Sequence, residues 1–249
     1  MPLYTAEALI LRTYKLGEAD RLVVFLTRDR GKKRGVAKGA RRVRSRFLGS
    51  LEPLTLGTVA YFEHEQRELV RIDEIEVARS PLAGAGGAAL GHVGYFAELL
   101  DEWAPDASPN EKLFRLGAAV VGAMAAGVPV ERLARYFEYW LLRLEGLYPS
   151  LVACAMCAAD LTVDGAVVSI RDRVFVCRPC GRSAGVTGGH LSADALAFLR
   201  AAARHEPGGL DALALTGRAA RELELAHHAL VTAHLEKELK SSRVLREMK

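Results

Sequence analysis

The sequence predicts a multidomain α+β protein: a small N-terminal β-barrel followed by a helical domain with a short cysteine-bearing insert. Three observations predict this arrangement. Strand-like runs fill the first 80 residues, helical periodicity dominates the remainder, and all four cysteines lie between residues 154 and 180. We expect the barrel over 1–80, the helical domain over 81–249 and the insert over 150–187.

The barrel is predicted from five short runs that are rich in strand-forming residues and separated by turn-forming ones. The runs are 5–14, 21–27, 33–38, 54–62 and 68–77. Five strands in about 80 residues, without a helical period, favour a Greek-key barrel of the oligonucleotide-binding (OB) type over a sandwich. Such a barrel is a common platform for single-stranded nucleic acid.

After residue 80 the sequence becomes rich in Ala and Leu, and glycines at 84–87 mark the predicted domain boundary. Apolar residues at helical spacing predict a helix from Leu90 to Trp103. Further helix starts are expected at Ser108 as N-cap, Pro129, Ser192 and Thr216. No uncharged apolar run reaches the roughly 20 residues that a membrane span needs. The N-terminus also lacks the pattern of a signal peptide.

Cations recur every third residue at the C-terminus, at Lys237, Lys240, Arg243, Arg246 and Lys249. They could touch a phosphate backbone if the last helix continues that far. A solvated chain end is the reading that we favour for them.

The cysteines form two pairs, Cys154 with Cys157 and Cys177 with Cys180, each with two residues between and with 19 residues between the pairs. This spacing is typical of a four-thiolate zinc site. We expect strands at 161–163, 166–170 and 173–176 to bring the ligands together. Reduced thiols and an iron-sulfur cluster remain alternatives. Four thiolates leave zinc no position for water, so the ion would be structural.

Positive charge is concentrated in one stretch, in which ten Lys or Arg residues stand against a single acid, Asp29. The local charge is +9 and that of the whole chain is +4, which leaves −5 elsewhere. Such a stretch is expected to bind phosphates, with a solvated loop as the alternative. The candidate residues are Arg28, Arg30, Lys32, Lys33, Arg34, Lys38, Arg41, Arg42, Arg44 and Arg46.

Aromatic residues near the basic stretch could stack on bases. Phe47 is the preferred candidate, because alternation along a strand requires one of Tyr61 and Phe62 to face the core. Other constellations are set aside. The acids Asp73, Glu74 and Glu76 fit a solvated strand edge better than a nuclease site, and His227, His228 and His234 fit packed or surface positions.

Four short segments between residues 17 and 53 resemble the N-terminal signature of the RecO family of bacterial recombination mediators. They are GEADR at 17–21, GKKRGVAKGARR at 31–42, SR at 45–46 and LEP at 51–53. Length and layout extend the resemblance over essentially the whole chain, although the helical part agrees only in pattern.

The resemblance implies a non-enzymatic protein that binds single- and double-stranded DNA, anneals complementary strands and assists recombinase loading. It also implies the partners RecR and single-stranded-DNA-binding protein, RecF as a further candidate, and a cytoplasmic, nucleoid-associated location. From the residues alone, an RNA-binding or ribosome-associated module is the alternative, since phosphate contacts do not distinguish DNA from RNA.

Overall fold

The computed structural model describes residues 2–64, 66–83 and 87–248. The chain forms two compact units, Met1–Gly127 with Leu239–Lys249, and Val128–Glu238. The first unit therefore contains more than the predicted barrel domain of 1–80, because two long helices and the C-terminal helix belong to it. Most of the predicted junction at 84–87 lies outside the described residues.

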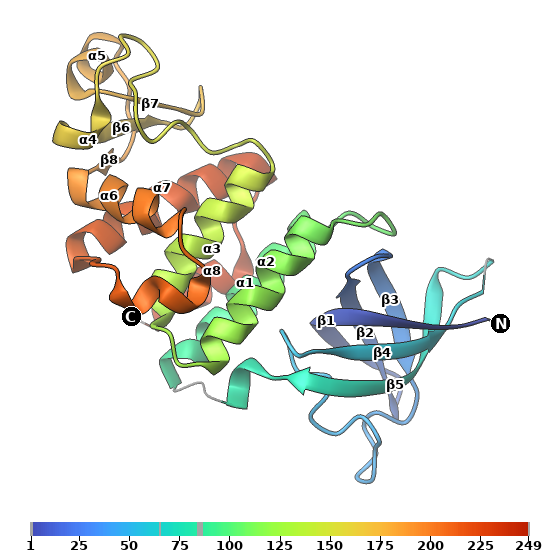
Figure 1. Cartoon of the computed structure of the whole chain (residues 1–249). Helices are drawn as coiled ribbons and strands as arrows, with labels where there is room; N and C mark the ends of the chain where they lie inside the picture. The colour runs from blue at the N-terminus through green and yellow to red at the C-terminus, as the bar shows by residue number, and fades with distance from the viewer. Residues whose placement is uncertain (1, 65, 84–86, 249) are drawn as a thin grey trace. The chain divides into compact units, whose positions relative to one another are not determined.

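The first unit contains a closed five-stranded barrel (Figure 1). Its strands are β1 Leu3–Leu16, β2 Asp20–Thr27, β3 Gly31–Ala37, β4 Leu56–Phe62 and β5 Leu69–Arg79. They close in the order β1-β2-β3-β5-β4, with β3 and β5 parallel and every other pair antiparallel. The barrel predicted from the five runs is confirmed. The main differences are at strand ends, such as β3, which begins two residues before the predicted start.

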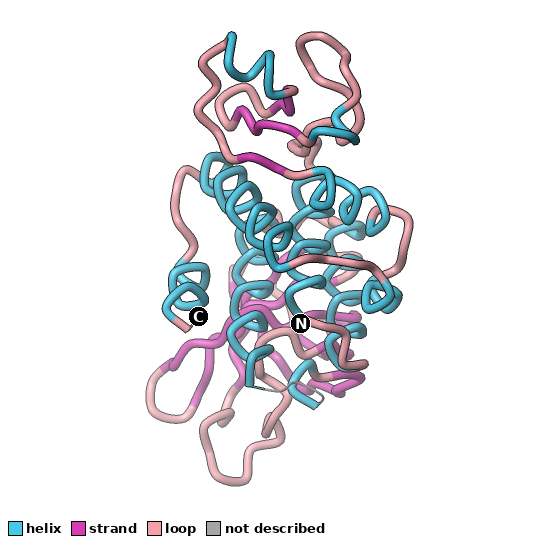
Figure 2. Tube along the Cα trace, turned by 90° about the vertical axis from the view of Figure 1, so that its left-hand side faces the viewer, coloured by secondary structure: helices cyan, strands magenta, loops and turns pink. Residues whose placement is uncertain are grey.

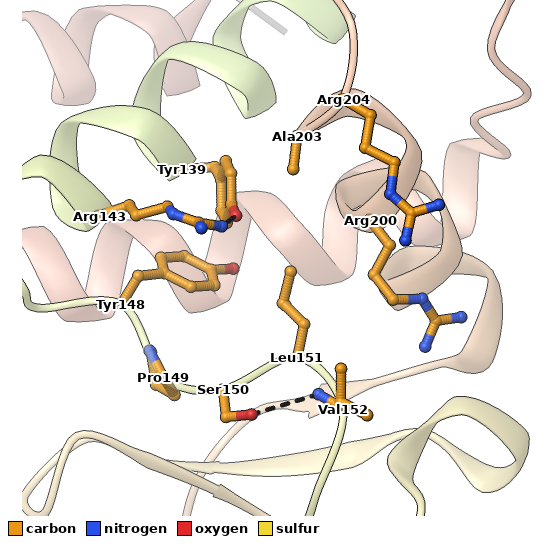
Figure 3. A pocket seen from close by; sticks show the side chains of 10 residues that line it. All are labelled: Tyr139, Arg143, Tyr148, Pro149, Ser150, Leu151, Val152, Arg200, Ala203 and Arg204. Atoms are coloured by element: carbon orange, nitrogen blue, oxygen red, sulfur yellow. Dashed lines mark hydrogen bonds between the residues drawn. The ribbon is translucent and has the colours of Figure 1, made fainter.

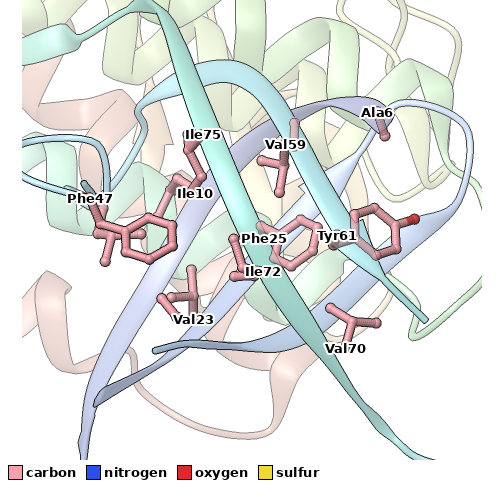
Figure 4. Packing of buried hydrophobic residues seen from close by; sticks show 13 residues of the cluster. Ala6, Ile10, Val23, Phe25, Phe47, Val59, Tyr61, Val70, Ile72 and Ile75 are labelled. Atoms are coloured by element: carbon pink, nitrogen blue, oxygen red, sulfur yellow. The ribbon is translucent and has the colours of Figure 1, made fainter. Parts of the chain in front are cut away.

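The barrel core is built from alternate residues of each strand, as Figure 4 shows. Tyr61 is fully buried and meets Phe25 edge-on, with ring centroids 5.7 Å apart. Its neighbour Phe62 is half-buried, and the Arg71 guanidinium lies 5.5 Å from its ring centroid. One of these two aromatics therefore faces inward, as alternation requires.

Three helices complete the first unit: α1 Gly87–Trp103, α2 Glu111–Ala125 and α8 Lys240–Glu247, with a short 3-10 turn η1 at Pro81–Ala83. Helix α1 packs on β1, α2 and α8. Val93, Ala97, Leu100 and Trp103 are buried as the periodicity predicts, but Leu90 is 53% exposed.

The cap of α2 differs from the prediction. Asn110, not Ser108, accepts a hydrogen bond from the Leu113 amide at 3.1 Å. The Ser108 backbone instead lies against Gly31, whose φ is +70°. A Cβ at Gly31 would stand 2.5 Å from that backbone, so only glycine permits the close approach.

The last helix of the first unit is held through its N-terminus. The Glu98 carboxylate on α1 accepts hydrogen bonds from the backbone amides of Lys240, at 3.3 Å, and Ser241, at 2.7 Å. A carboxylate at this position satisfies free amides and complements the helix dipole.

The second unit contains three longer helices and a small sheet. Its elements are α3 Val130–Leu144, α4 Leu161–Asp164, β6 Ala166–Ser169, β7 Val174–Val176, α5 Arg178–Ser183, β8 His190–Leu191, α6 Ala193–Ala202, η2 Pro207–Ala212 and α7 Gly217–Leu235. Helix α3 packs on α6 and α7. The sheet has the order β7-β6-β8, and in Figure 2 it lies beyond one end of these helices among loops and short helical turns.

One prediction for the second unit is corrected. Residues 161–163 form the helical turn α4, not a strand, because the Asp160 carboxylate caps that turn by accepting from the Thr162 amide at 2.7 Å. Helix α7 ends at Leu235, because Glu236 has a φ of +55°, so the alternative in which the last helix continues along the C-terminal cations does not hold. Lys240, Arg243 and Arg246 lie instead on the separate helix α8. Ser192 and Thr216 cap their helices as expected. In the part of the chain that the structure describes, no helix combines the length and apolar character of a membrane span.

A buried polar cluster joins α3 to α7 in the second unit. His227 is fully buried, and its Nδ1 lies 2.7 Å from Oε2 of Glu138, which also pairs with Arg135 at 2.9 Å. The His227 Nε2 atom lies 2.7 Å from the Tyr148 hydroxyl. A neutral imidazole that donates from Nδ1 and accepts at Nε2 satisfies both contacts. Burial lowers the pKa of His227, although Glu138 opposes the shift.

This cluster predicts a loss of stability in mild acid. Because the folded pKa of His227 lies below its unfolded value of about 6.5, the unfolded chain takes up the proton first as pH falls through that value. The free energy of unfolding should therefore decrease from pH about 7 toward pH about 5 in chemical unfolding experiments. His227→Gln should flatten this decrease. The exposed His205→Gln is the control, and an unchanged decrease in His227→Gln would contradict the assignment.

Candidate nucleic-acid interface and metal centre

The basic stretch lies entirely on the barrel of the first unit. Arg28 and Arg30 occupy the turn between β2 and β3, and Lys32, Lys33 and Arg34 follow on β3. The remaining cations lie in the segment between β3 and β4, residues 38–55, which we call the basic loop.

Several of the predicted cations are already paired with acids of the same unit. Arg28 lies 2.9 Å from Glu111, and the Lys33 ammonium contacts Glu63. A cation held by a carboxylate must give up that partner before it can bind a phosphate, so these residues offer less net affinity.

Lys32 has a structural role. Its ammonium is largely buried, donates to the Asp101 backbone carbonyl at 2.7 Å and pairs with Asp101 and Asp106 at 3.4 Å each. Asp101 also holds Arg12 of β1 at 2.7 Å. These contacts tie β1 and β3 to α1 and to the connection that follows it, which leaves Lys32 unavailable to a ligand.

Arg30 and Arg46 are held by rings and acids together. Arg30 lies 4.3 Å from the centroid of the Tyr4 ring, with Asp29 at 3.9 Å. Arg46 pairs with Asp73 at 3.3 Å. This pair gives Asp73, one of the acids on β5, a cationic partner within the same unit.

Five of the ten predicted cations form no ion pair with any acid among the described residues. All five are exposed, and four of them lie on the basic loop. They are Arg34, Lys38, Arg41, Arg42 and Arg44. Arg41 donates to the Gly17 carbonyl at 2.9 Å, a contact that orients its guanidinium and leaves its charge uncompensated.

The basic loop is fixed to the barrel at both sides. At its start, the Gly39 amide donates to the Asp20 carboxylate at 2.7 Å and the Arg41 amide donates to the Ala19 carbonyl at 2.9 Å. Further along, Phe47 and Leu51 are buried in the barrel core. The loop thus presents its cations from a defined backbone.

The prediction that Phe47 stacks on a base is wrong in this structure. The Phe47 side chain is only 2% exposed and belongs to the barrel core (Figure 4). The Arg46 guanidinium lies 5.1 Å from its ring centroid. The sequence could not distinguish an anchoring aromatic from a stacking one, because both follow a basic run in the same way.

The four cysteines of the second unit gather as the spacing predicts. Their sulfur atoms all lie within 4.8 Å of one another, and those of Cys157 and Cys177 are 3.7 Å apart. A tetrahedral zinc site with bonds of about 2.3 Å places its sulfurs about 3.8 Å apart, so the donor set fits such an ion. Among the described residues, this is the one group of three or more His, Cys, Asp or Glu side chains close enough to share a metal.

Backbone amides prepare one of these sulfurs for a metal. Burial opposes ionisation of Cys154, but donation from the amides of Cys177, Cys157 and Met156 outweighs it and lowers the pKa of the thiol to about 6. The Cys177 amide lies 3.2 Å from the Cys154 sulfur. Amide donation to a sulfur stabilises its thiolate form, which is the form that binds a metal.

A pocket of about 480 Å³ lies in the second unit and was not predicted (Figure 3). Tyr139 and Tyr148 form one wall, and Arg143 contacts the Tyr139 hydroxyl. Arg200 and Arg204 line it from α6 and the residues just after it. Arg204 lies beyond the end of α6 at Ala202, so helical spacing in the sequence could not have grouped it with Arg200.

Removing one cysteine tests the metal centre. Cys177→Ala should lose the bound metal in elemental analysis, since three thiolates hold zinc far less tightly than four. Hydrogen exchange should increase around 154–191 while the barrel stays protected. Met156→Ala, an exposed change between the first two ligands, is the control. Full metal content in Cys177→Ala would contradict the four-thiolate assignment.

Two family models together match most of the chain. Residues 1–81 match the family described as Recombination protein O N terminal, and residues 86–243 match Recombination protein O C terminal. A DNA repair protein RecO of Koribacter versatilis is 44% identical over 160 residues, or 63% of this chain and 64% of that protein. One from Anaeromyxobacter sp. (strain K) is 37% identical over 245 residues, covering 96% of this chain and 94% of the relative. One from Geobacter metallireducens is 31% identical over 97% of this chain and 96% of its own length. These matches confirm the resemblance found in the sequence, and the chain belongs to the RecO family of DNA repair proteins.

Proposed function

We propose that this chain is a non-enzymatic recombination mediator that binds single- and double-stranded DNA and anneals complementary strands. The observation that carries the proposal is the group of five cations that pair with no acid among the described residues, four of them on one ordered loop of an OB-type barrel. Cations without acidic partners gain the full benefit of releasing counterions from DNA.

The proposed mechanism is charge neutralisation. Two strands repel each other through their phosphates, and the cations Arg34, Lys38, Arg41, Arg42 and Arg44 lower that repulsion while they hold the backbones close. Bases held through their backbones remain free to pair. The step forms no covalent bond and requires no nucleotide.

Partners follow from the family and not from any contact of this chain. We infer that the protein acts with RecR on strands coated by single-stranded-DNA-binding protein, with RecF as a further partner, and assists recombinase loading there. We also infer that the ion at the four cysteines is zinc. Four protein thiolates fill its tetrahedral shell, so the metal stabilises the insert and takes no part in strand pairing.

The salt dependence of binding tests the proposed site. Each phosphate contact with a single strand contributes about 0.7 to the slope of log affinity against log salt. Replacing Arg41, Arg42 and Arg44 together with Ala should therefore weaken binding and reduce the slope by about 2. Fluorescence anisotropy with a labelled oligonucleotide measures both quantities.

A matched triple variant serves as the control. Arg28, Arg30 and Arg46 replaced with Ala remove the same charge, but these cations are paired with acids, so the slope should change little. Equal effects of the two triple variants would show that the number of charges removed matters and that the lack of an acidic partner does not. Tighter binding to RNA than to DNA of the same sequence would favour the RNA-binding alternative.

A further inference from the structure

Two apolar side chains project from the basic loop into solvent. Val43 is 95% exposed and Leu48 is 83% exposed. They are the most exposed large hydrophobic residues in the part of the chain that the structure describes. Isolated exposed hydrophobic residues are ordinary. These two are unusual because they share one loop with four uncompensated cations.

The loop backbone holds them in place by local hydrogen bonds. The Ser45 amide donates to the Arg42 carbonyl at 3.1 Å, and the Ser50 hydroxyl donates to the Phe47 carbonyl at 3.1 Å. Phe47 itself lies between the two exposed residues in sequence and is buried in the barrel core. The exposure of Val43 and Leu48 is therefore a feature of an ordered, anchored segment.

The residues next to Val43 indicate which kind of ligand could contact it. Arg42 and Arg44 flank it in sequence, and neither has an acidic partner among the described residues. A ligand must then offer an apolar surface next to negative charge. An unpaired nucleotide does so, because the face of its base adjoins its phosphate. A duplex hides its base faces, and exposing them costs the free energy of unstacking.

We propose that Val43 and Leu48 contact the bases of a single strand whose phosphates are bound by the basic loop. This inference rests on the proposed function and adds that the DNA bound at this contact is single-stranded. The apolar contacts carry no charge, so they contribute affinity that does not depend on salt. They also favour unpaired DNA over duplex, which would release a strand from this contact once its bases pair.

The test compares Val43→Ala/Leu48→Ala with wild type on three labelled probes: a single strand, an abasic strand of the same length, and a duplex. On the normal strand the double variant should bind about tenfold more weakly, as expected for losing partial burial of two aliphatic groups. On the abasic strand the two proteins should bind equally, and on the duplex they should differ by less than about twofold. The salt slope should not change.

The control variant is Val163→Ala/Leu225→Ala, which removes one exposed Val and one exposed Leu from the second unit and should leave all three affinities unchanged. Circular dichroism establishes that each variant is folded. No loss on the normal strand would overturn the inference, as would an equal loss on the abasic strand, since the contact would then not involve bases. If wild type bound no DNA, or the Arg41, Arg42 and Arg44 variant bound normally, the proposed function itself would fail.

Discussion

A lysine or arginine on this barrel can bind a phosphate only to the extent that no carboxylate of the same chain already holds it. That constraint divides the basic stretch into two parts. Arg28, Lys32 and Lys33 are held by acids, and Lys32 serves to fasten β3 to α1. Arg34 and the cations at 38–44 lack acidic partners among the described residues. The candidate interface is thus a part of the stretch, and its position is set by where acids of the first unit lie.

The barrel supplies the frame that makes this division possible. The barrel closes where β5 pairs with β3, the strand that carries Arg34. The basic loop connects β3 to β4. Phe47 anchors that loop in the core, and hydrogen bonds to Ala19 and Asp20 fix its other side. The second unit has its own sources of order, namely the cysteine centre and the buried contact between Glu138 and His227. In the function proposed above, these features stabilise the second unit, and DNA binding is assigned to the first unit.

A feature could be predicted from the sequence when the residues that produce it are close together along the chain. Strand alternation and the spacing of cysteines are local, so the five strands and the clustering of the four cysteines could be predicted. The pairing of Arg28 with Glu111 spans 83 residues and that of His227 with Glu138 spans 89, and neither leaves a periodic signal. The sequence also did not show which of two neighbouring residues caps a helix, or which of two roles an aromatic residue takes. Asn110 takes the cap expected at Ser108, and Phe47 serves the core where base stacking was expected.

In the proposed mechanism, cations of the basic loop that lack acidic partners among the described residues bring two strands together. The most direct measurement is the rate of annealing of complementary oligonucleotides, both coated with single-stranded-DNA-binding protein, followed by fluorescence without added nucleotide. We expect the protein to accelerate pairing, and we expect this acceleration to decline with salt and in the Arg41, Arg42 and Arg44 triple variant. Binding without any acceleration, or acceleration that survives in the triple variant, would contradict the proposed mechanism.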